Sequence, residues 1–537
     1  MESDVLWLII LGLTLLAGIM TGIPVMLVIA GVPLAIAFIA SIFGAFDLSF
    51  LLAYPNRIFG VMNNTILIAV PLFVLMGVLL EQSRVAERML LNMTRMLGGS
   101  RGTLVLSVIV VSALIAASTG IIGATVVMLG MIALPALLHA GVSERLSSGL
   151  ICASGTLGQI IPPSIVLIIL GDQISNAHIE AQRNVGNFAP DPVTVGDLFA
   201  GALLPGLVLV ALYSVYALAA VNLGAAPDSA TENVTSDNGL NDITADGVNA
   251  SADARDLIVT VAPPILLIIA VLGSILMGVA TPTEAAAVGV LGTLLIAAGY
   301  SDVKFKLLPV IMFFTALAAF GLVVLKASGA THIDASGLSG SMGIGTLVAI
   351  FCALLLLAGM VTAIWCLWRV DVLVGAITRT IEISAMIFGI IIAASMLSLV
   401  FRGFQGDEIV NELLTSIPGE KWGMLIVTMT VIFLLGFVLE FVEIVLIVIP
   451  IIGPVLLATD FDPVWLAVLV ALNLQTSFLT PPFGFALFYF RSVAPKEVST
   501  ETIYLSIIPF VIIQLLAMVI VVAFPALATW LPSLLFG

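Results

Sequence analysis

Two long stretches without a charged side chain constrain this chain more than any other feature. Residues 341–368 contain no charged residue, and neither do residues 503–537. Each stretch is long enough to cross a hydrocarbon core of about 30 Å as a helix. Charged residues make up 9% of the 537 residues, whereas soluble domains contain about 25%. Continuous apolar runs also disfavour a β-barrel, in which apolar and polar residues alternate. The sequence therefore predicts an all-α polytopic membrane protein.

The charged residues exclude several classes of function. Residues 222–256 carry seven acidic side chains and one arginine, and their polar composition is typical of a flexible loop that cannot fold alone. The chain has no basic stripe, so we expect no nucleic-acid partner. Three cysteines and three histidines are scattered, which disfavours disulfides and a zinc site. Catalytic and redox ligands and a phosphate-binding loop are missing, so we predict a transporter driven by an ion gradient and not an enzyme.

Hydropathy divides the chain into single and interrupted membrane segments. Single helices are expected at about 5–20, 25–43, 63–81, 198–221, 257–279, 283–300, 307–326, 342–364, 381–400 and 504–531. The windows 103–140, 145–171, 423–459 and 463–491 are apolar but interrupted. Lys and Arg favour cytoplasmic loops, and the densest cluster is Arg84, Arg88, Arg95 and Arg101. Placing this cluster inside predicts a periplasmic N-terminus.

Two of the interrupted windows share a pattern of small and polar residues followed by two prolines. The pair Pro162–Pro163 lies 319 residues before the pair Pro481–Pro482. In the orientation above the two windows have opposite directions, so they are inverted repeats, as in secondary transporters. A proline pair removes two backbone donors, and freed carbonyls are tolerated at membrane depth only where they line a cavity or bind an ion. Ordinary proline kinks are the alternative. The recurrence of the same pattern with a proline pair in both windows, in opposite directions, favours two broken helices.

Each broken helix follows a window that we expect to form a re-entrant hairpin, 103–140 or 423–459. The first tip, residues 117–125, is rich in glycine and hydroxyl side chains. The second tip contains Glu440 and Glu443 within an apolar run. Carboxylates at membrane depth are costly and are therefore functional candidates. The alternative is that one of them contacts water at the tip.

Pairing each tip with the adjacent break predicts two cation sites, because hydroxyls and freed carbonyls supply oxygen ligands. The first would use Ser118, Thr119, Gly123 or Thr125 with Gly155, Gly158 and Pro162. The second would use Glu440 or Glu443 with Asn473, Thr476 and Thr480. We expect two or more sodium ions as coupling ions and no other cofactor. Proton coupling is the alternative, because membrane carboxylates can relay protons.

An organic substrate would lie between the two broken helices. Helix N-termini beyond the proline pairs would point their positive dipoles at its carboxylate. The residues expected to contact the substrate are Thr156, Gln159, Ser164, Gln475 and Pro481.

Four motifs spread over almost the whole chain carry a family resemblance. They are Ala-Val-Pro-Leu-Phe at 69–73, Gly-Thr-Leu-Gly-Gln-Ile-Ile-Pro-Pro-Ser at 155–164, Thr-Pro-Thr-Glu-Ala-Ala-Ala-Val-Gly at 281–289 and Leu-Thr-Pro-Pro-Phe-Gly at 479–484. With these the chain resembles the large membrane (M) subunit of tripartite ATP-independent periplasmic (TRAP) transporters, in the branch named for mannitol and chloroaromatic compounds. One departure is that Glu440 and Glu443 stand where the family often has one Asp.

The resemblance implies an elevator-type transporter in the bacterial inner membrane, with a scaffold and a transport domain that holds both hairpins. It also implies a separate small four-helix membrane subunit and a periplasmic binding protein. The expected parts are N-terminal scaffold helices and a cytoplasmic arm (1–102), a first transport repeat (103–171), a connecting loop and helix (172–221), an acidic flexible cytoplasmic loop (222–256), scaffold helices and a second arm (257–400), a second transport repeat (423–491) and a C-terminal helix (504–531).

The predicted function is that of the large permease subunit of a sodium-coupled transporter that imports an organic acid delivered by the binding protein. A self-sufficient sodium/carboxylate symporter with the same hairpins and no binding protein is the alternative. A subunit of a membrane enzyme would need catalytic or redox ligands within the spans.

Overall fold

Helices make up most of the described part of the computed structural model, which covers residues 2–83, 85–96, 100–120, 122–223, 254–301, 308–327, 344–481, 484–496 and 498–537. No strand occurs within these ranges. Seven of the described helices are long and apolar enough to cross a membrane. The prediction of an all-α polytopic membrane protein is confirmed.

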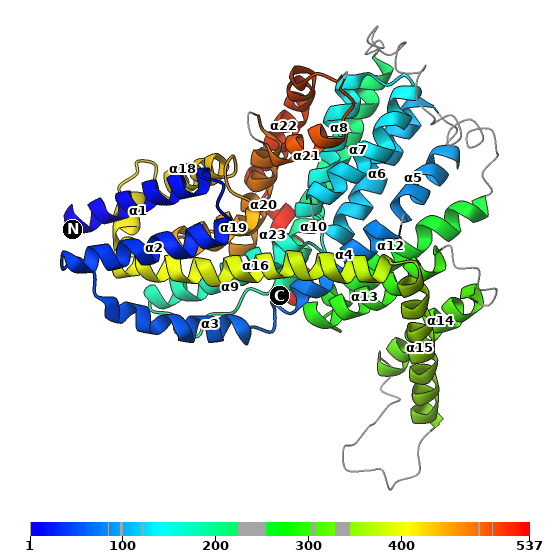
Figure 1. Ribbon diagram of the computed structural model, residues 1–537, viewed down its shortest axis with the longest axis horizontal. Coiled ribbons are helices and arrows are strands. Elements are labelled where there is room, and N and C mark those ends of the chain that lie inside the picture. Colours follow the sequence, from blue (N-terminus) through cyan, green and yellow to red (C-terminus); the bar gives the residue numbers. More distant parts are fainter. Residues whose placement is uncertain are drawn as a thin grey trace.

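One long helix, α16 (Val372–Gly403), runs through the middle of the molecule (Figure 1). It packs along α2 (Val25–Ile42) and α4 (Ala69–Gln82), and α4 packs against α13 (Pro282–Gly299). Helix α1 (Glu2–Met20) lies beside α2. These helices form a frame beside the interrupted segments.

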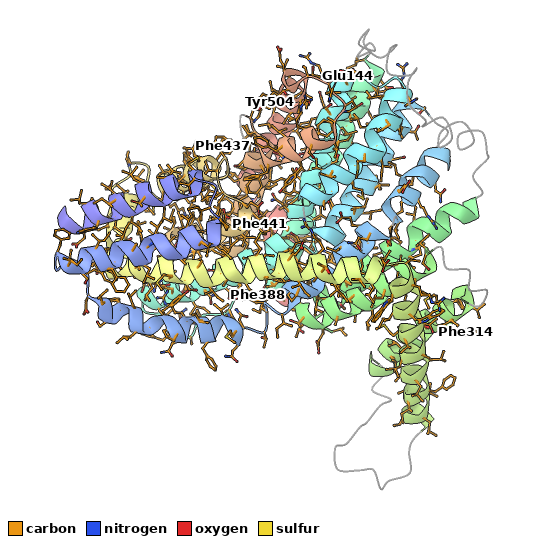
Figure 2. The ribbon with its side chains drawn as sticks, in the orientation of Figure 1. Glu144, Phe314, Phe388, Phe437, Phe441 and Tyr504 are labelled. Atoms are coloured by element: carbon orange, nitrogen blue, oxygen red, sulfur yellow. The ribbon has the colours of Figure 1, made fainter. Side chains whose placement is uncertain are left out.

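The remaining helices of this part are shorter or lie at its edge. They are α3 (Tyr54–Met62), α5 (Val85–Met96), α12 (Ala254–Leu276), α14 (Leu308–Ala327), α15 (Ile344–Arg369) and α17 (Gly406–Thr415), with a 3₁₀ turn, η1, at Leu48–Ala53. Helices α14 and α15 pack on each other and project from the rest of the molecule (Figure 1). Phe314 of α14 is 48% exposed there (Figure 2). Only 11% of the apolar window of α15 is buried, as expected of a helix that faces lipid.

All four interrupted windows have the predicted breaks. The first hairpin is α6 (Arg101–Thr119) and α7 (Ile122–His139), and the second is α18 (Glu420–Leu435) and α19 (Phe441–Leu457). The first broken helix is α8 (Glu144–Thr156), the 3₁₀ turn η2 (Leu157–Gln159) and α9 (Ile165–Asn184). The second is α20 (Pro463–Leu479) and α21 (Phe485–Val493). Helices α10 (Val195–Asn222) and α22 (Thr500–Ala523) follow the two broken helices.

The two repeats are intertwined. Helix α9 of the first repeat packs on α19 of the second, and α21 of the second packs on α7 of the first. Each distal half of a broken helix therefore lies against the second arm of the other hairpin. Helix α20 is buried along its whole length from Val464 to Leu479, so it forms the core of this part of the molecule.

Three predicted boundaries were wrong. Helix α9 continues past residue 171 to Asn184, because Asp172 lowers the hydropathy without ending the helix. Helix α16 begins at Val372 and not near 381, so Arg379 lies inside the helix and not before it. The C-terminal segment is two helices, α22 and α23 (Ala526–Phe536). They separate at Phe524, because a residue before a proline is disfavoured in the helical conformation. Of the acidic stretch 222–256, residues 224–253 lie outside the described residues.

Candidate functional site: two hairpin tips around one cavity

The first hairpin turns at a glycine whose backbone other residues rarely adopt. Gly120 has φ +61° at the C-terminus of α6, a left-handed conformation that glycine adopts without steric cost. A Cβ atom built on Gly120 would lie 3.2 Å from the backbone nitrogen of Ile165, the first residue of α9. The tip of the hairpin therefore touches the helix that follows the first break.

The first break also lies against the first hairpin. A Cβ atom on Gly158 would lie 2.8 Å from the carbonyl oxygen of Ala116 in α6. One on Gly155 would lie 2.4 Å from the side chain of Val126 in α7. The structure thus brings the first hairpin and the first break together.

The other predicted ligands of the first site lie on the same elements. Ser118 and Thr119 are the last two residues of α6, and their side chains lie outside the described part of the chain. Gly123 and Thr125 are in the first turn of α7, where Thr125 is buried. Pro162 is buried in the segment between η2 and α9.

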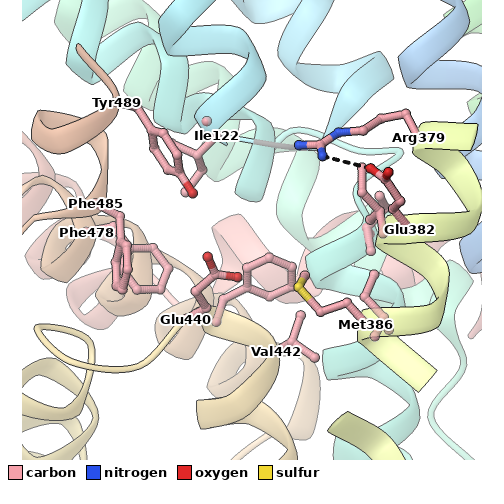
Figure 3. A pocket seen from close by; sticks show the side chains of 15 residues that line it. Ile122, Arg379, Glu382, Met386, Glu440, Val442, Phe478, Phe485 and Tyr489 are labelled. Carbon is pink, nitrogen blue, oxygen red and sulfur yellow. Dashed lines mark hydrogen bonds and ion pairs between the residues drawn. The ribbon is translucent and has the colours of Figure 1, made fainter. Parts of the chain in front are cut away.

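The second hairpin tip holds two carboxylates, Glu440 and Glu443, at the start of α19. Glu443 is 4% exposed, and its Oε2 atom accepts a hydrogen bond of 3.1 Å from the backbone N–H of Glu440. This bond belongs to a capping box, in which the Glu440 side chain also accepts from the backbone N–H of Glu443, so both carboxylates cap the start of α19. Glu440 is the N-cap residue of α19, and its carboxylate points into a cavity (Figure 3).

Hydrogen bonds join the second broken helix to the first arm of the second hairpin. The Nδ2 atom of Asn473 donates to the carbonyl of Met429 at 2.7 Å, and Oγ of Ser477 donates to that of Phe433 at 3.0 Å. The hydroxyls of Thr476 and Thr480 donate to carbonyls of their own helix at 2.7 Å. Their oxygen atoms keep lone pairs that can still bind a cation.

The close approach of hairpin and break is repeated in both halves. Ser477 occupies the position equivalent to Gly158, 319 residues later. It lies so close to Gly436 that a Cβ atom on this glycine would overlap the Ser477 side chain. Gly436 directly follows Leu435, the equivalent of Ala116. Ser477 and Gly436 are not among the residues predicted from the sequence, although the 319-residue offset identifies them.

A cavity of about 270 Å³ lies where the two tips meet (Figure 3). Its lining residues come from the first hairpin (Gly120, Ile122, Gly123), α9 (Ile165), α16 (Arg379, Glu382, Ile383, Met386, Ile387), the second hairpin (Glu440, Phe441, Val442), and α20 and α21 (Phe478, Phe485, Tyr489). Both hairpins, both broken helices and the long helix of the frame therefore share one cavity.

The cavity contains both signs of charge. Arg379 and Glu382 form an ion pair on α16, with 3.2 Å between Nη1 and Oε2. Tyr489 lies within electrostatic range of both Glu440 and Arg379, and its hydroxyl group points into the same space as the Glu440 carboxylate (Figure 3). Arg379 is not among the site residues predicted from the sequence. An Arg and a Glu three residues apart in an apolar run were the signal that could have found it.

The five residues predicted to contact the substrate do not line this cavity. Thr156, Gln159, Ser164 and Gln475 are fully buried, and Pro481 is partly buried at the second break. Nε2 of Gln475 donates to Oγ1 of Thr156 at 3.2 Å. These two residues are equivalent in the repeats, so this hydrogen bond joins the two halves at the axis that relates them.

Two hairpins, two broken helices and one shared cavity define the class of this protein, a polytopic membrane carrier built from inverted repeats. The chain belongs to the family described as "Tripartite ATP-independent periplasmic transporter, DctM component", which matches residues 12–335 and 340–527. It is therefore a large permease subunit of the TRAP type. Subunits of this type are multi-pass proteins of the inner membrane that work with a small membrane subunit and a periplasmic binding protein.

Curated relatives cover nearly the whole chain. The C4-dicarboxylate TRAP transporter large permease protein DctM of Vibrio cholerae is 26% identical over 95% of this chain and 96% of the relative. The ectoine TRAP transporter large permease protein TeaC of Halomonas elongata is 23% identical over 97% and 98%. The isethionate TRAP transporter permease protein DctMQ of Oleidesulfovibrio alaskensis is 24% identical over 93% and 64%. Among solved structures, the Alcanivorax borkumensis YdaH transporter matches with a TM-score of 0.49 and 14% identity, over 90% of this chain and 88% of that one.

Proposed function

We propose that this permease couples the import of an organic acid to sodium influx through cation sites at its two hairpin tips. The observation that carries the proposal is the shared cavity, which both tips and both broken helices line. Relatives are named for C4-dicarboxylates, ectoine and isethionate, so the substrate is taken to be a small organic acid.

The first sodium ion binds between the first tip and the first break. Pro162 and Pro163 lack a backbone N–H, so carbonyls before them lose their helical partners. Gly155 and Gly158 let the hairpin approach this segment closely. Carbonyls near the break and hydroxyls at the tip supply the oxygen ligands, drawn from the predicted set at 118–125 and 155–162.

The second sodium ion binds at Glu440. Both carboxylates take part in the capping box of α19, and that of Glu440 also faces the cavity. Asn473, Thr476 and Thr480 of the adjacent α20 complete the proposed ligand set.

The charges of the cavity give the coupling a physical basis. Arg379, Glu382 and Glu440 line it together, so the lining carries one excess negative charge when all three are ionised. An anionic substrate is repelled in that state. One sodium ion at Glu440 neutralises the excess negative charge. Bound sodium therefore raises the affinity for the anionic substrate, and bound substrate raises the affinity for sodium, as linkage requires.

Transport then follows an elevator movement of the two repeats against the frame. The moving unit comprises α6–α9 and α18–α21, which extends the predicted repeat 103–171 to the end of α9. The frame comprises α1–α5 and α12–α16. The excess of Lys and Arg on the predicted cytoplasmic side supports a periplasmic N-terminus.

Glu440→Gln tests the second sodium site, because it keeps the shape and one acceptor oxygen but removes the charge. Sodium-driven uptake into proteoliposomes with the small subunit and the binding protein is measured against sodium concentration. The variant should need at least tenfold more sodium for half-maximal uptake, or about 1.4 kcal/mol. The control is Glu412→Gln, which removes an exposed carboxylate from α17.

Two results would contradict the proposal. Wild-type sodium dependence in Glu440→Gln would remove the second site. Equal uptake in sodium-free buffer under a proton gradient would replace sodium by protons as the coupling ion.

A further inference from the structure

We propose that the cavity takes a small organic monoanion with an apolar body, and that Arg379 binds its carboxylate. This inference rests on the proposed function, because it assigns the substrate class of the same cavity. It also assigns a specificity role to a residue of α16, a helix of the frame.

The number of positive charges that line the cavity limits the number of carboxylates on the substrate. Arg379 is the single basic side chain among the described residues that line the cavity, and Glu382 and Glu440 are acidic. Glu81 of α4 also lies within electrostatic range of Arg379, although it does not line the cavity. A second carboxylate on the substrate would therefore face acidic groups without a basic partner, which disfavours a dicarboxylate.

The second argument is that Arg379 can change partners at low cost. The side chains of Arg379 and Glu382 are 60% and 58% exposed, and ion pairs this exposed contribute little to stability. A carboxylate inside the cavity offers the planar guanidinium a two-bond, charge-assisted contact, which is stronger and more directional. Binding thus exchanges a weak intrahelical pair for a stronger intermolecular one.

The third argument is the apolar remainder of the lining. Met386 of α16 and the pair Phe478 and Phe485 present hydrophobic surface to the cavity (Figure 3). Phe441 of α19 also lines it. The rings of Phe478 and Phe485 meet edge to face, with 5.6 Å between centroids. A polyhydroxylated acid would leave several hydroxyls unpaired here, which costs affinity.

The small volume of the cavity also limits the size of the substrate. The cavity volume of about 270 Å³ lies below the range of roughly 300–1,000 Å³ that is usual for drug-sized ligands. It therefore suits an acid whose body is a single ring or a short alkyl chain.

The test compares three sodium salts as probes: benzoate, succinate and gluconate. Binding to the purified complex of the permease with its small subunit is measured by calorimetry in sodium buffer, without the binding protein. Benzoate should bind more tightly than succinate or gluconate. Arg379→Gln should weaken benzoate binding at least tenfold, Arg379→Lys should weaken it less, and Glu382→Gln should strengthen it.

Arg183→Gln is the matched control, because it removes an exposed arginine at the end of α9 and should leave benzoate binding unchanged. The proposal is overturned if succinate or gluconate binds as tightly as benzoate, if wild type does not bind benzoate, or if Arg379→Gln binds it normally. Those results would leave sodium-driven uptake intact, so they are distinguishable from a failure of the proposed function.

Discussion

At the scale of single residues, the proposed cation sites depend on how closely backbone segments approach. Gly158 and Ser477 hold equivalent positions in the two repeats, and each lies against the first arm of its hairpin. Gly158 has no space for a side chain, because a Cβ atom would press on a backbone carbonyl that cannot move independently. The small residue therefore sets the distance between the proposed ligands on the tip and those on the break.

Gly158→Ala should separate the first tip from the first break. Overpacking of this kind costs about 1–3 kcal/mol, so the variant should unfold at a lower temperature and need more sodium for half-maximal uptake. Thermal unfolding and sodium titration of uptake are the measurements. Gly31→Ala is the control, since nothing lies within 4 Å of a Cβ atom at that position of α2. Unchanged sodium affinity in Gly158→Ala would show that this approach does not shape the site.

At the scale of helices, local signals in the sequence predicted the breaks and starts well. Thr281 and Glu284 form a capping box at the start of α13, as their spacing predicts. The proline pair in residues 153–164 marks the gap between η2 and α9. Both features depend on nearby residues, so they can be predicted without tertiary information.

Features that depend on distant packing could not be predicted in this way. Arg379 and Glu440 line the same cavity, and only the fold brings α16 next to the second hairpin. Asp172 reads as the end of an apolar segment, yet it lies inside α9, where it accepts a hydrogen bond of 2.8 Å from Asn64. Hydropathy is calculated for each segment alone. It therefore does not include a distant partner that stabilises a polar side chain.

Replacing both Pro162 and Pro163 by alanine should let α8 and α9 join into one helix. The restored N–H groups would occupy the carbonyls that are proposed to bind sodium. Transport should fall steeply, while membrane insertion and purification remain normal. Pro135→Ala is the control, because Pro135 lies inside the continuous helix α7. A double variant with normal sodium affinity would remove the main support for the first site.

At the scale of the whole molecule, polar contacts along α9 tie the proposed moving unit to the frame. Arg402 near the end of α16 donates to both carboxylate oxygens of Glu180 at 2.9 Å and pairs with Asp407 at 3.2 Å. The Asn64–Asp172 hydrogen bond lies two turns earlier on the same helix. An elevator movement of α9 past α16 must break these contacts. They therefore stabilise the observed state relative to the state reached after the movement.

Glu180→Gln should therefore change the rate of transport more than the stability of the fold. Arg402 and Glu180 are 32% and 39% exposed, so their pair contributes at most about 1 kcal/mol. That amount shifts an equilibrium between two states by roughly fivefold. Initial uptake rates are compared in Glu180→Gln, Arg402→Gln and the double variant. Because the two residues act through one contact, the effects should not add, and the sodium concentration for half-maximal uptake should stay the same. Fully additive effects would mean that the ion pair does not take part in the movement.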